Sequence, residues 1–163
     1  MIHCLGTDFR KTTHIKPDQA ARILARVYRN VLREFNFGRQ HRLWIAQRLF
    51  GSDAAATERS TPILPTCLRL LPISSGIYAG NLTPHMPAIT HTALVMAFDS
   101  LLEPERLSLR YGPVVQDFHV QDSALNRRFP PEIQMCVFLQ TEHEPFKPMF
   151  GQKANAQGRR LFQ

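Results

Sequence analysis

Cysteines and long apolar runs are scarce in this sequence. The three cysteines, Cys4, Cys67 and Cys136, are odd in number and far apart, and no CxxC pair occurs, which excludes a disulfide framework and favours a reducing compartment. No apolar stretch approaches the length that a bilayer-spanning helix needs, and Asp8 and Arg10 interrupt the N-terminal residues too early for a secretory signal. We therefore expect an intracellular protein that does not cross a membrane.

Local signatures of catalysis and of cofactor binding are also missing. The sequence contains no glycine-rich phosphate loop and no pair of metal-ligand motifs. Asp117, His119 and Asp122 provide three ligand-type groups, but on a strand Asp122 would point away from the other two. Each cysteine has apolar neighbours, as expected for a buried small side chain. We expect no cofactor, no metal and no enzymatic activity, with a dispersed catalytic site around His119 or His91 as an alternative.

Basic charge is concentrated at the two ends of the chain, which has a net charge of +7. Residues 1–50 hold ten basic and three acidic side chains, residues 51–144 hold six and ten, and residues 145–163 hold four basic side chains and no acid. The chain has sixteen arginines and four lysines, a ratio that favours bidentate contacts with phosphate or carboxylate. This distribution indicates a molecule that binds a polyanion or an acidic lipid surface.

The segment from Pro17 to Phe37 has the periodicity of an amphipathic helix. Pro17 suits the first helical position, Asp18 complements the positive end of the helix dipole, and Gly38 is expected to end the helix in a left-handed turn. At about 100° per residue, one broad face of this helix is apolar: Ile23, Leu24, Val27, Tyr28, Val31, Leu32 and Phe35. The opposite face carries arginines within a narrow arc: Arg22, Arg26, Arg29 and Arg33.

A second helix is expected from Arg39 to Phe50. Its apolar residues go most of the way round, so it should be packed on several sides. A short link between two helices tends to place them side by side, which would bring Arg39 and Arg42 near the arginines of the first helix. Like charges at this spacing repel one another by roughly a few tenths of a kcal/mol per pair. The arginines therefore form either a solvated face or a surface for an anion that a partner supplies.

Two further segments of the chain are basic. Arg127 and Arg128 lie in an expected loop, and residues 145–163 have little periodicity and are expected to be a loosely held basic tail. The complete candidate set for binding nucleic acid, lipid or another anion is as follows: Arg22, Arg26, Arg29, Arg33, Arg39, Arg42, Arg127, Arg128, Lys153, Arg159 and Arg160.

Residues 74–87 are expected to form a long loop, and long loops in compact domains are often functional. Among its serines, glycines and prolines are four apolar side chains: Ile77, Tyr78, Leu82 and Met86. These side chains either pack back onto the domain or form a surface for self-association.

The second half of the chain has the pattern of an antiparallel sheet. Five segments are rich in strand formers or alternate apolar with polar residues: Thr66–Leu71, Ala88–Phe98, Arg106–Tyr111, Val114–Val120 and Glu132–Thr141. Residues 99–105 would form a hairpin connection, and residues 1–10 a short initial strand. The order predicts an α+β fold with an N-terminal helical pair packed on a mainly antiparallel sheet. We expect residues 1–144 to form a single globular domain that precedes the basic tail at 145–163.

The expected elements follow one another in a characteristic order. An initial strand precedes a helix ending near Phe35 and a shorter helix closing at residues 48–52; a strand at 67–71, a long proline-containing loop and a hairpin from 94–98 to 107–109 follow. This order, together with the size and basic charge, resembles the globular part of rhabdovirus-type matrix proteins. The resemblance implies a structural virion protein that bridges a ribonucleoprotein and the inner face of a membrane, self-associates through an exposed loop and drives budding.

Three functions are compatible with these observations. The first is a matrix-like, self-associating assembly protein that binds ribonucleoprotein and acidic lipid, located in the cytoplasm and peripherally at a membrane. The second is an RNA-binding regulatory protein whose arginines contact phosphates, with Tyr28, Phe37 or Trp44 available to stack on bases if they are exposed. The third is an enzyme with a dispersed site.

Overall fold

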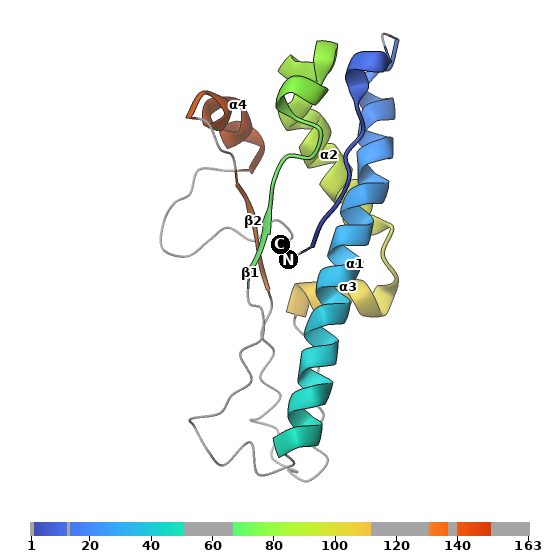
Figure 1. The fold of residues 1–163 in the computed structure, drawn as a ribbon, viewed down its shortest axis with the longest axis vertical. Helices are drawn as coiled ribbons and strands as arrows, with labels where there is room; N and C mark the ends of the chain where they lie inside the picture. Colours follow the sequence, from blue (N-terminus) through green and yellow to red (C-terminus); the bar gives the residue numbers. More distant parts are fainter. Residues whose placement is uncertain (1, 13, 51–66, 112–130, 137–139, 151–163) are drawn as a thin grey trace.

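The computed structural model describes residues 2–12, 14–50, 67–111, 131–136 and 140–150. Its longest element is the helix α1 (Pro17–Phe50), which has 34 residues and is therefore about 51 Å long at 1.5 Å per residue. The helices α2 (Met86–Asp99) and α3 (Glu103–Tyr111) pack against the N-terminal and middle parts of α1, and α4 (Gln140–Phe150) packs on α2. A small sheet lies beside these helices (Figure 1). The C-terminal turns of α1 extend past these other described elements.

The helix α1 begins as the sequence predicts but does not end at Gly38. Pro17 and Asp18 occupy its first turn, and it runs unbroken to Phe50. The predicted pair of helices is therefore wrong, because both segments belong to one helix. Phe35 and Arg39 are buried on either side of the glycine. An interior glycine costs about 1 kcal/mol relative to alanine, less than the roughly 1.5–3 kcal/mol that burial of a phenylalanine contributes.

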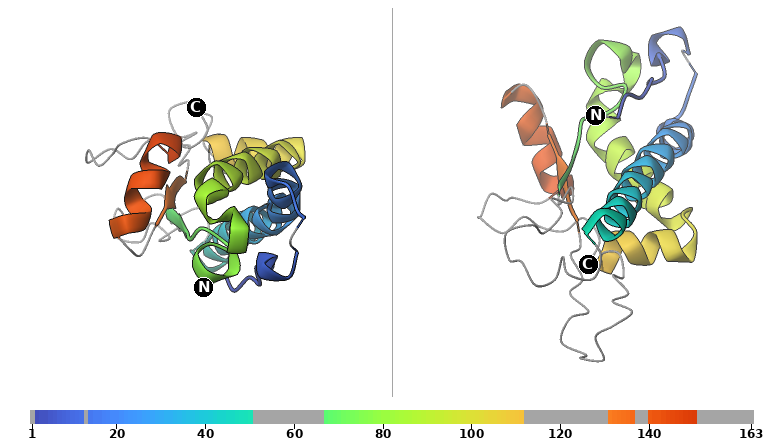
Figure 2. Two further views of the ribbon diagram at one scale, coloured as in Figure 1. Left: turned by 90° about the horizontal axis from the view of Figure 1, so that it is seen from above. Right: turned by 60° about the horizontal axis from the view of Figure 1, so that its bottom comes forward.

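The predicted strand at Ala88–Phe98 is wrong, because these residues belong to the helix α2 (Met86–Asp99). Apart from Pro87 in the first turn, the buried side chains of α2 recur at helical intervals: Met86, Ile89, Thr90, Ala93, Leu94 and Ala97. Helix α2 packs against α1 on one side and against α4 on the other, as the two orientations in Figures 1 and 2 show. Burial on two sides explains why its sequence has no clear polar face.

The predicted hairpin at residues 99–105 and the predicted strand at Arg106–Tyr111 are also wrong, because residues 103–111 form the helix α3 (Glu103–Tyr111). The carboxylate of Glu105 accepts a hydrogen bond from the backbone N–H of Leu102 at 2.9 Å, which caps the start of α3. Helix α3 packs against the middle of α1. At this junction the hydroxyl of Ser108 donates a hydrogen bond to the buried side-chain oxygen of Asn36 at 2.7 Å.

The sheet has two strands within the described residues, and they run parallel. Strand β1 (Cys67–Leu70) and strand β2 (Glu132–Met135) pair with Leu68 opposite Ile133. Both strands fall where strands were predicted, but the described part of the molecule is mostly helical. The prediction of a mainly antiparallel sheet carrying a helical pair is therefore wrong.

The helix α4 (Gln140–Phe150) follows β2. It includes the first six residues of the predicted basic tail, and Phe146 within it is buried. The predicted strand at Val114–Val120 lies outside the described residues, as do residues 151–163 of the tail. The predicted division at residue 144 stays a prediction.

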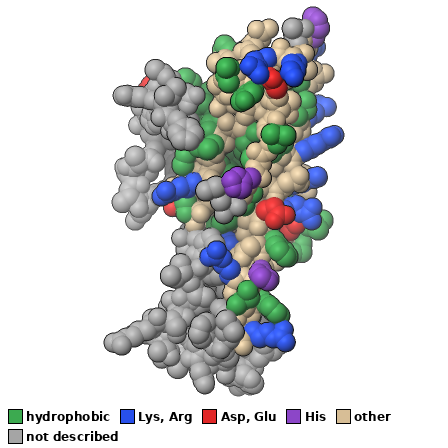
Figure 3. Space-filling model, in the orientation of Figure 1, with side chains coloured by type: hydrophobic (Ala, Val, Ile, Leu, Met, Phe, Trp, Pro, Cys, Tyr) green, Lys and Arg blue, Asp and Glu red, His purple; other side chains and the backbone are tan. Residues whose placement is uncertain are grey.

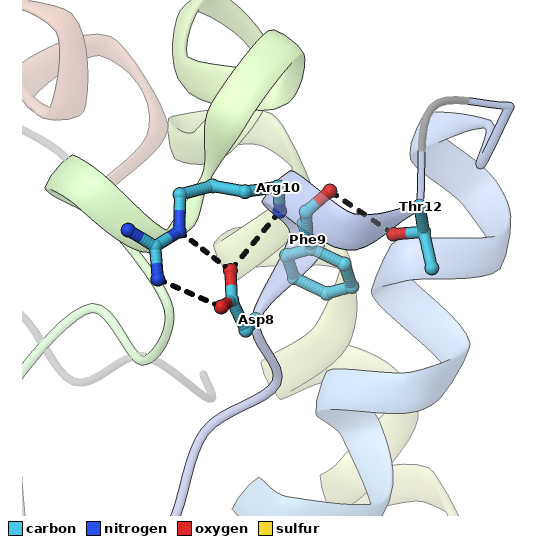
Figure 4. A network of polar contacts seen from close by, with 4 residues as sticks. All are labelled: Asp8, Phe9, Arg10 and Thr12. Carbon is cyan, nitrogen blue, oxygen red and sulfur yellow. Dashed lines mark hydrogen bonds and ion pairs between the residues drawn. The ribbon is translucent and has the colours of Figure 1, made fainter.

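The N-terminal residues form a 3₁₀ turn, η1 (Phe9–Lys11), preceded by irregular backbone, so the predicted initial strand is wrong. The carboxylate of Asp8 accepts hydrogen bonds from the backbone N–H and the guanidinium of Arg10, and the Thr12 hydroxyl donates to the Phe9 carbonyl at 3.0 Å (Figure 4). This turn packs on η4 (Gly80–His85), where a Cβ at Gly80 would lie 3.2 Å from the Cα of Arg10.

The predicted loop at 74–87 is largely made of short helical turns. It contains η3 (Gly76–Tyr78) and η4, and it ends in the first turn of α2. The resemblance to matrix proteins included a hairpin of residues 94–98 and 107–109. These residues lie in the helices α2 and α3.

Tyr28 connects α1 to the chain that leaves β1. Its hydroxyl accepts a hydrogen bond from the backbone N–H of Ile73 at 2.9 Å and donates one to the carbonyl of Leu71 at 3.3 Å. The side chain is fully buried in the core that α1, α2 and the sheet share. Burial raises the pKa of Tyr28 to about 12.

Candidate functional site

The arginines predicted on one face of α1 do lie along one side of the helix. We call Arg22, Arg26, Arg29 and Arg33 the arginine row. Arg22 and Arg26 are exposed. Figure 3 shows Lys and Arg side chains projecting along the edge of the molecule that α1 forms. Because the apolar side of α1 is occupied by α2, this row faces outward.

The other two members of the row, Arg29 and Arg33, are less available to an outside ligand. Arg29 is half-buried, and its Nε is buried without a hydrogen-bond partner among the described residues. Arg33 is exposed, but its Nε donates a hydrogen bond to the carboxylate of Glu105 on α3 at 2.8 Å. The repulsion between the arginines is thus relieved internally at one position, while Arg22 and Arg26 stay available to an outside anion.

Arg39 and Arg42 were expected to join the arginine row through the packing of a second helix against the first. They do not extend the row, because both belong to α1 itself. Arg39 is fully buried, and its guanidinium carbon lies 5.7 Å from the ring centroid of Phe35. Burial lowers the pKa of Arg39 below its usual value. Arg42 is exposed, but it lies about 160° around the helix from Arg26 at 100° per residue.

A row of aromatic and basic side chains follows the arginine row along α1. The rings of Phe37 and His41 stack with centroids 6.1 Å apart and an interplanar angle of 11°. The rings of His41 and Trp44 stack with centroids 6.0 Å apart and an angle of 18°. The guanidinium carbon of Arg48 lies 5.0 Å from the Trp44 ring centroid. Phe37 is 65% exposed and Trp44 is 52% exposed. We call Phe37, His41, Trp44 and Arg48 the aromatic row.

The two rows form one stripe. Each has successive intervals of four, three and four residues, and Phe37 follows Arg33 by four more. These intervals keep side chains on one side of an α-helix. From Arg22 to Arg48 the stripe is about 39 Å long at 1.5 Å per residue.

The remaining predicted anion-binding residues lie outside the described part of the chain: Arg127, Arg128, Lys153, Arg159 and Arg160. Of the predicted self-association residues, Ile77 is 71% exposed and Tyr78 is 51% exposed. Leu82 and Met86 are buried and belong to the core. The guanidinium carbon of Arg10 lies 5.0 Å from the Tyr78 ring centroid, so the exposed part of this segment is a small apolar and basic patch.

The described residues do not assemble the alternative catalytic site. His91 is half-buried and packs edge-on against the ring of Phe150, and His119 lies outside the described residues. Among the described residues, no cluster of three or more His, Cys, Asp and Glu side chains is placed to hold a metal. Cys4 is exposed rather than buried, and Cys67 and Cys136 are half-buried. Burial raises the pKa of the Cys67 thiol, which disfavours the thiolate form.

Three residues of this region are not predicted from the sequence: His41 and Arg48 as members of the stripe, and Glu105 as the partner of Arg33. The repeated four, three, four interval would have found the first two if the helix had been continued through Gly38. The pairing with Glu105 depends on the fold, because 72 residues separate the two side chains.

Within the described residues, no helix has the length and apolar character that crossing a bilayer requires. No protein-family model, curated protein or solved structure matches this chain.

Proposed function

We propose that this chain is a non-enzymatic protein that binds RNA, with the exposed arginines of α1 contacting the phosphate backbone. The single observation that carries the proposal is the outward position of Arg22 and Arg26 on the face of α1 opposite the core. Guanidinium groups bind phosphate bidentately, and a rigid helix presents them at a fixed spacing.

RNA accounts for the stripe better than a simple anion does. Its basic side chains continue into exposed rings, and single-stranded nucleic acids are bound by surfaces that combine cations with aromatic side chains. A solvated arginine face would give no reason for the large exposed rings of Phe37 and Trp44 in direct continuation. An intracellular location fits this role.

A binding measurement with labelled single-stranded RNA tests the proposal. Fluorescence anisotropy at low salt should give at least about tenfold weaker binding for the double variant Arg22→Glu, Arg26→Glu than for the wild type. The matched control is Arg69→Glu, which reverses the charge of an exposed arginine on β1. Equal loss of affinity in the control, or no loss in the double variant, would count against an interface on α1.

A matrix-like assembly protein on an acidic membrane is the second candidate. It is supported by Ile77, which is 71% exposed beside the Arg10 and Tyr78 pair, because an apolar tip flanked by a cation suits a lipid interface. Cosedimentation with phosphatidylserine vesicles should then decrease in the variant Ile77→Ser and be accompanied by concentration-dependent self-association. Vesicle binding that needs neither Ile77 nor acidic lipid would exclude this role.

A further inference from the structure

We infer that the aromatic row of α1 is a stacking platform for unpaired bases, so that the RNA bound by this protein is single-stranded at that point. The inference rests on the proposed function, because the same stripe supplies the phosphate contacts. It adds that the aromatic row, which is the second half of the stripe, contacts the bases of the nucleic acid.

The rings of the platform are available to a planar ligand. Phe37 and Trp44 expose 65% and 52% of their surface, although both are large apolar side chains at the surface of a folded chain. Their centroids lie 6.1 and 6.0 Å from that of His41, whereas stacked nucleotides are about 3.4 Å apart along a strand. Contact with His41 leaves part of the Phe37 and Trp44 rings open to a base, as their exposed fractions show, although Arg48 also lies over Trp44.

The orientation of the rings suits successive bases. The interplanar angles of 11° and 18° make the three rings nearly parallel. Nearly parallel rings present flat surfaces in one orientation, on which successive unpaired bases can stack. The platform is held by the backbone of a single helix, which fixes the spacing before the ligand arrives.

Charge on both sides of the platform favours nucleic acid over another aromatic ligand. Arg48 lies over Trp44 at 5.0 Å at one end. At the other end Arg33, which is 52% exposed although it pairs with Glu105, precedes Phe37 by one helical turn. A strand whose bases stack on Phe37 and Trp44 therefore has guanidinium groups near its phosphates at both ends. Duplex RNA cannot use the platform, because its bases are stacked within the helix.

The fluorescence of Trp44 tests the inference directly, because it is the only tryptophan in the chain. The wild-type protein is titrated with an oligouridine of about 15 nucleotides, with an abasic strand of the same length and with duplex RNA. Stacking predicts that oligouridine quenches the emission. The abasic strand, which has the same phosphates, should bind about tenfold more weakly or worse and leave the emission unchanged.

Two variants separate stacking from phosphate binding. Trp44→Leu and Phe37→Leu should each weaken oligouridine binding by about fivefold to a hundredfold, while the dependence of the affinity on salt keeps the wild-type slope, because no charge is removed. Tyr78→Leu, which removes an exposed ring outside α1, is the control and should bind like the wild type. Far-ultraviolet circular dichroism verifies that each variant is folded. If a variant does not fold, the titration of the wild-type protein still tests the inference.

The possible failures are distinguishable. Equal binding of oligouridine and the abasic strand, with unchanged Trp44 emission, would overturn the stacking platform and leave the arginine contacts in place. Failure of all three nucleic acids to bind at low salt would overturn the proposed function together with the platform.

Discussion

The Nε of Arg33 on α1 and the Oε1 of Glu105 on α3 are joined by a hydrogen bond of 2.8 Å across 72 residues of sequence. The same carboxylate accepts the backbone N–H of Leu102 through its other oxygen at 2.9 Å. Glu105 therefore caps α3, ties it to α1 and neutralises one member of the arginine row.

Replacing Glu105 by glutamine should release Arg33 for an outside anion. Glutamine keeps an oxygen that can cap α3 but removes the negative charge, so we expect RNA affinity to rise by about threefold at low salt. The free energy of unfolding should fall by less than about 1 kcal/mol, because Arg33 is about half exposed and the pair is screened by solvent. Asp99→Asn, which removes an exposed acid at the end of α2, is the control. Weaker binding in Glu105→Gln would argue that Arg33 does not face the ligand.

Gly38 lies in the interior of α1, where a Cβ would meet no atom within 4 Å. The variant Gly38→Ala should therefore raise the free energy of unfolding by about 0.5–1 kcal/mol, measured by urea denaturation. Gly80→Ala should have the opposite effect, since Gly80 has a φ of 56° and its Cβ would crowd Arg10. A destabilised Gly38→Ala variant would mean that the helix ends at this glycine.

Gly38 is also the position at which the predicted end of the helix is wrong. The 3.6-residue period of residues 17–37 was sufficient to predict the helix and its two faces, and β1 and β2 both fall within predicted strands. Gly38 was assigned to a helix end because glycine is common there, but tertiary burial of Phe35 and Arg39 overrides that preference.

The structure of the second half of the chain was harder to predict, for physical reasons. Ile89, Thr90 and Val95 favour strands by propensity, and α2 is buried on two sides, so neither propensity nor a polar face indicated a helix. In α3, by contrast, a usable signal was overlooked: Glu103, Pro104 and Glu105 form an acidic, proline-containing first turn that is typical of helix starts. The ion pair between α1 and α3 could not be predicted, because it requires the packing of distant segments.

The buried hydroxyl of Tyr28 should contribute to the stability of the fold. Tyr28→Phe keeps the buried ring but leaves the N–H of Ile73 without its acceptor, so the free energy of unfolding should fall by about 1–3 kcal/mol in urea denaturation. Tyr78→Phe, at an exposed ring, should change it by less than about 0.5 kcal/mol. Equal small effects in both variants would show that the buried hydroxyl does not stabilise the fold.

The pH dependence of stability follows from the same group. The pKa of Tyr28 is raised to about 12 in the folded state against 10.0 ordinarily, because burial disfavours the phenolate. A raised pKa in the folded state means that the unfolded chain loses its proton first, so stability is fully present below pH 10 and is lost as the pH rises through 12. The loss is about 3 kcal/mol. The difference between wild type and Tyr28→Phe should therefore shrink over this window, and a constant difference would contradict the assignment.

The salt dependence of RNA binding tests the central claim most directly. The logarithm of the association constant for a single-stranded RNA should fall linearly with the logarithm of the salt concentration, and each phosphate contact contributes a slope of about −0.7. Because Arg22 and Arg26 are exposed, whereas Arg33, also exposed, is paired with Glu105, the variant Arg22→Gln, Arg26→Gln should have a slope shallower by about 1.4 than the wild type. A slope identical to that of the wild type would contradict the account, because it would mean that the arginines of α1 release no counterions when RNA binds.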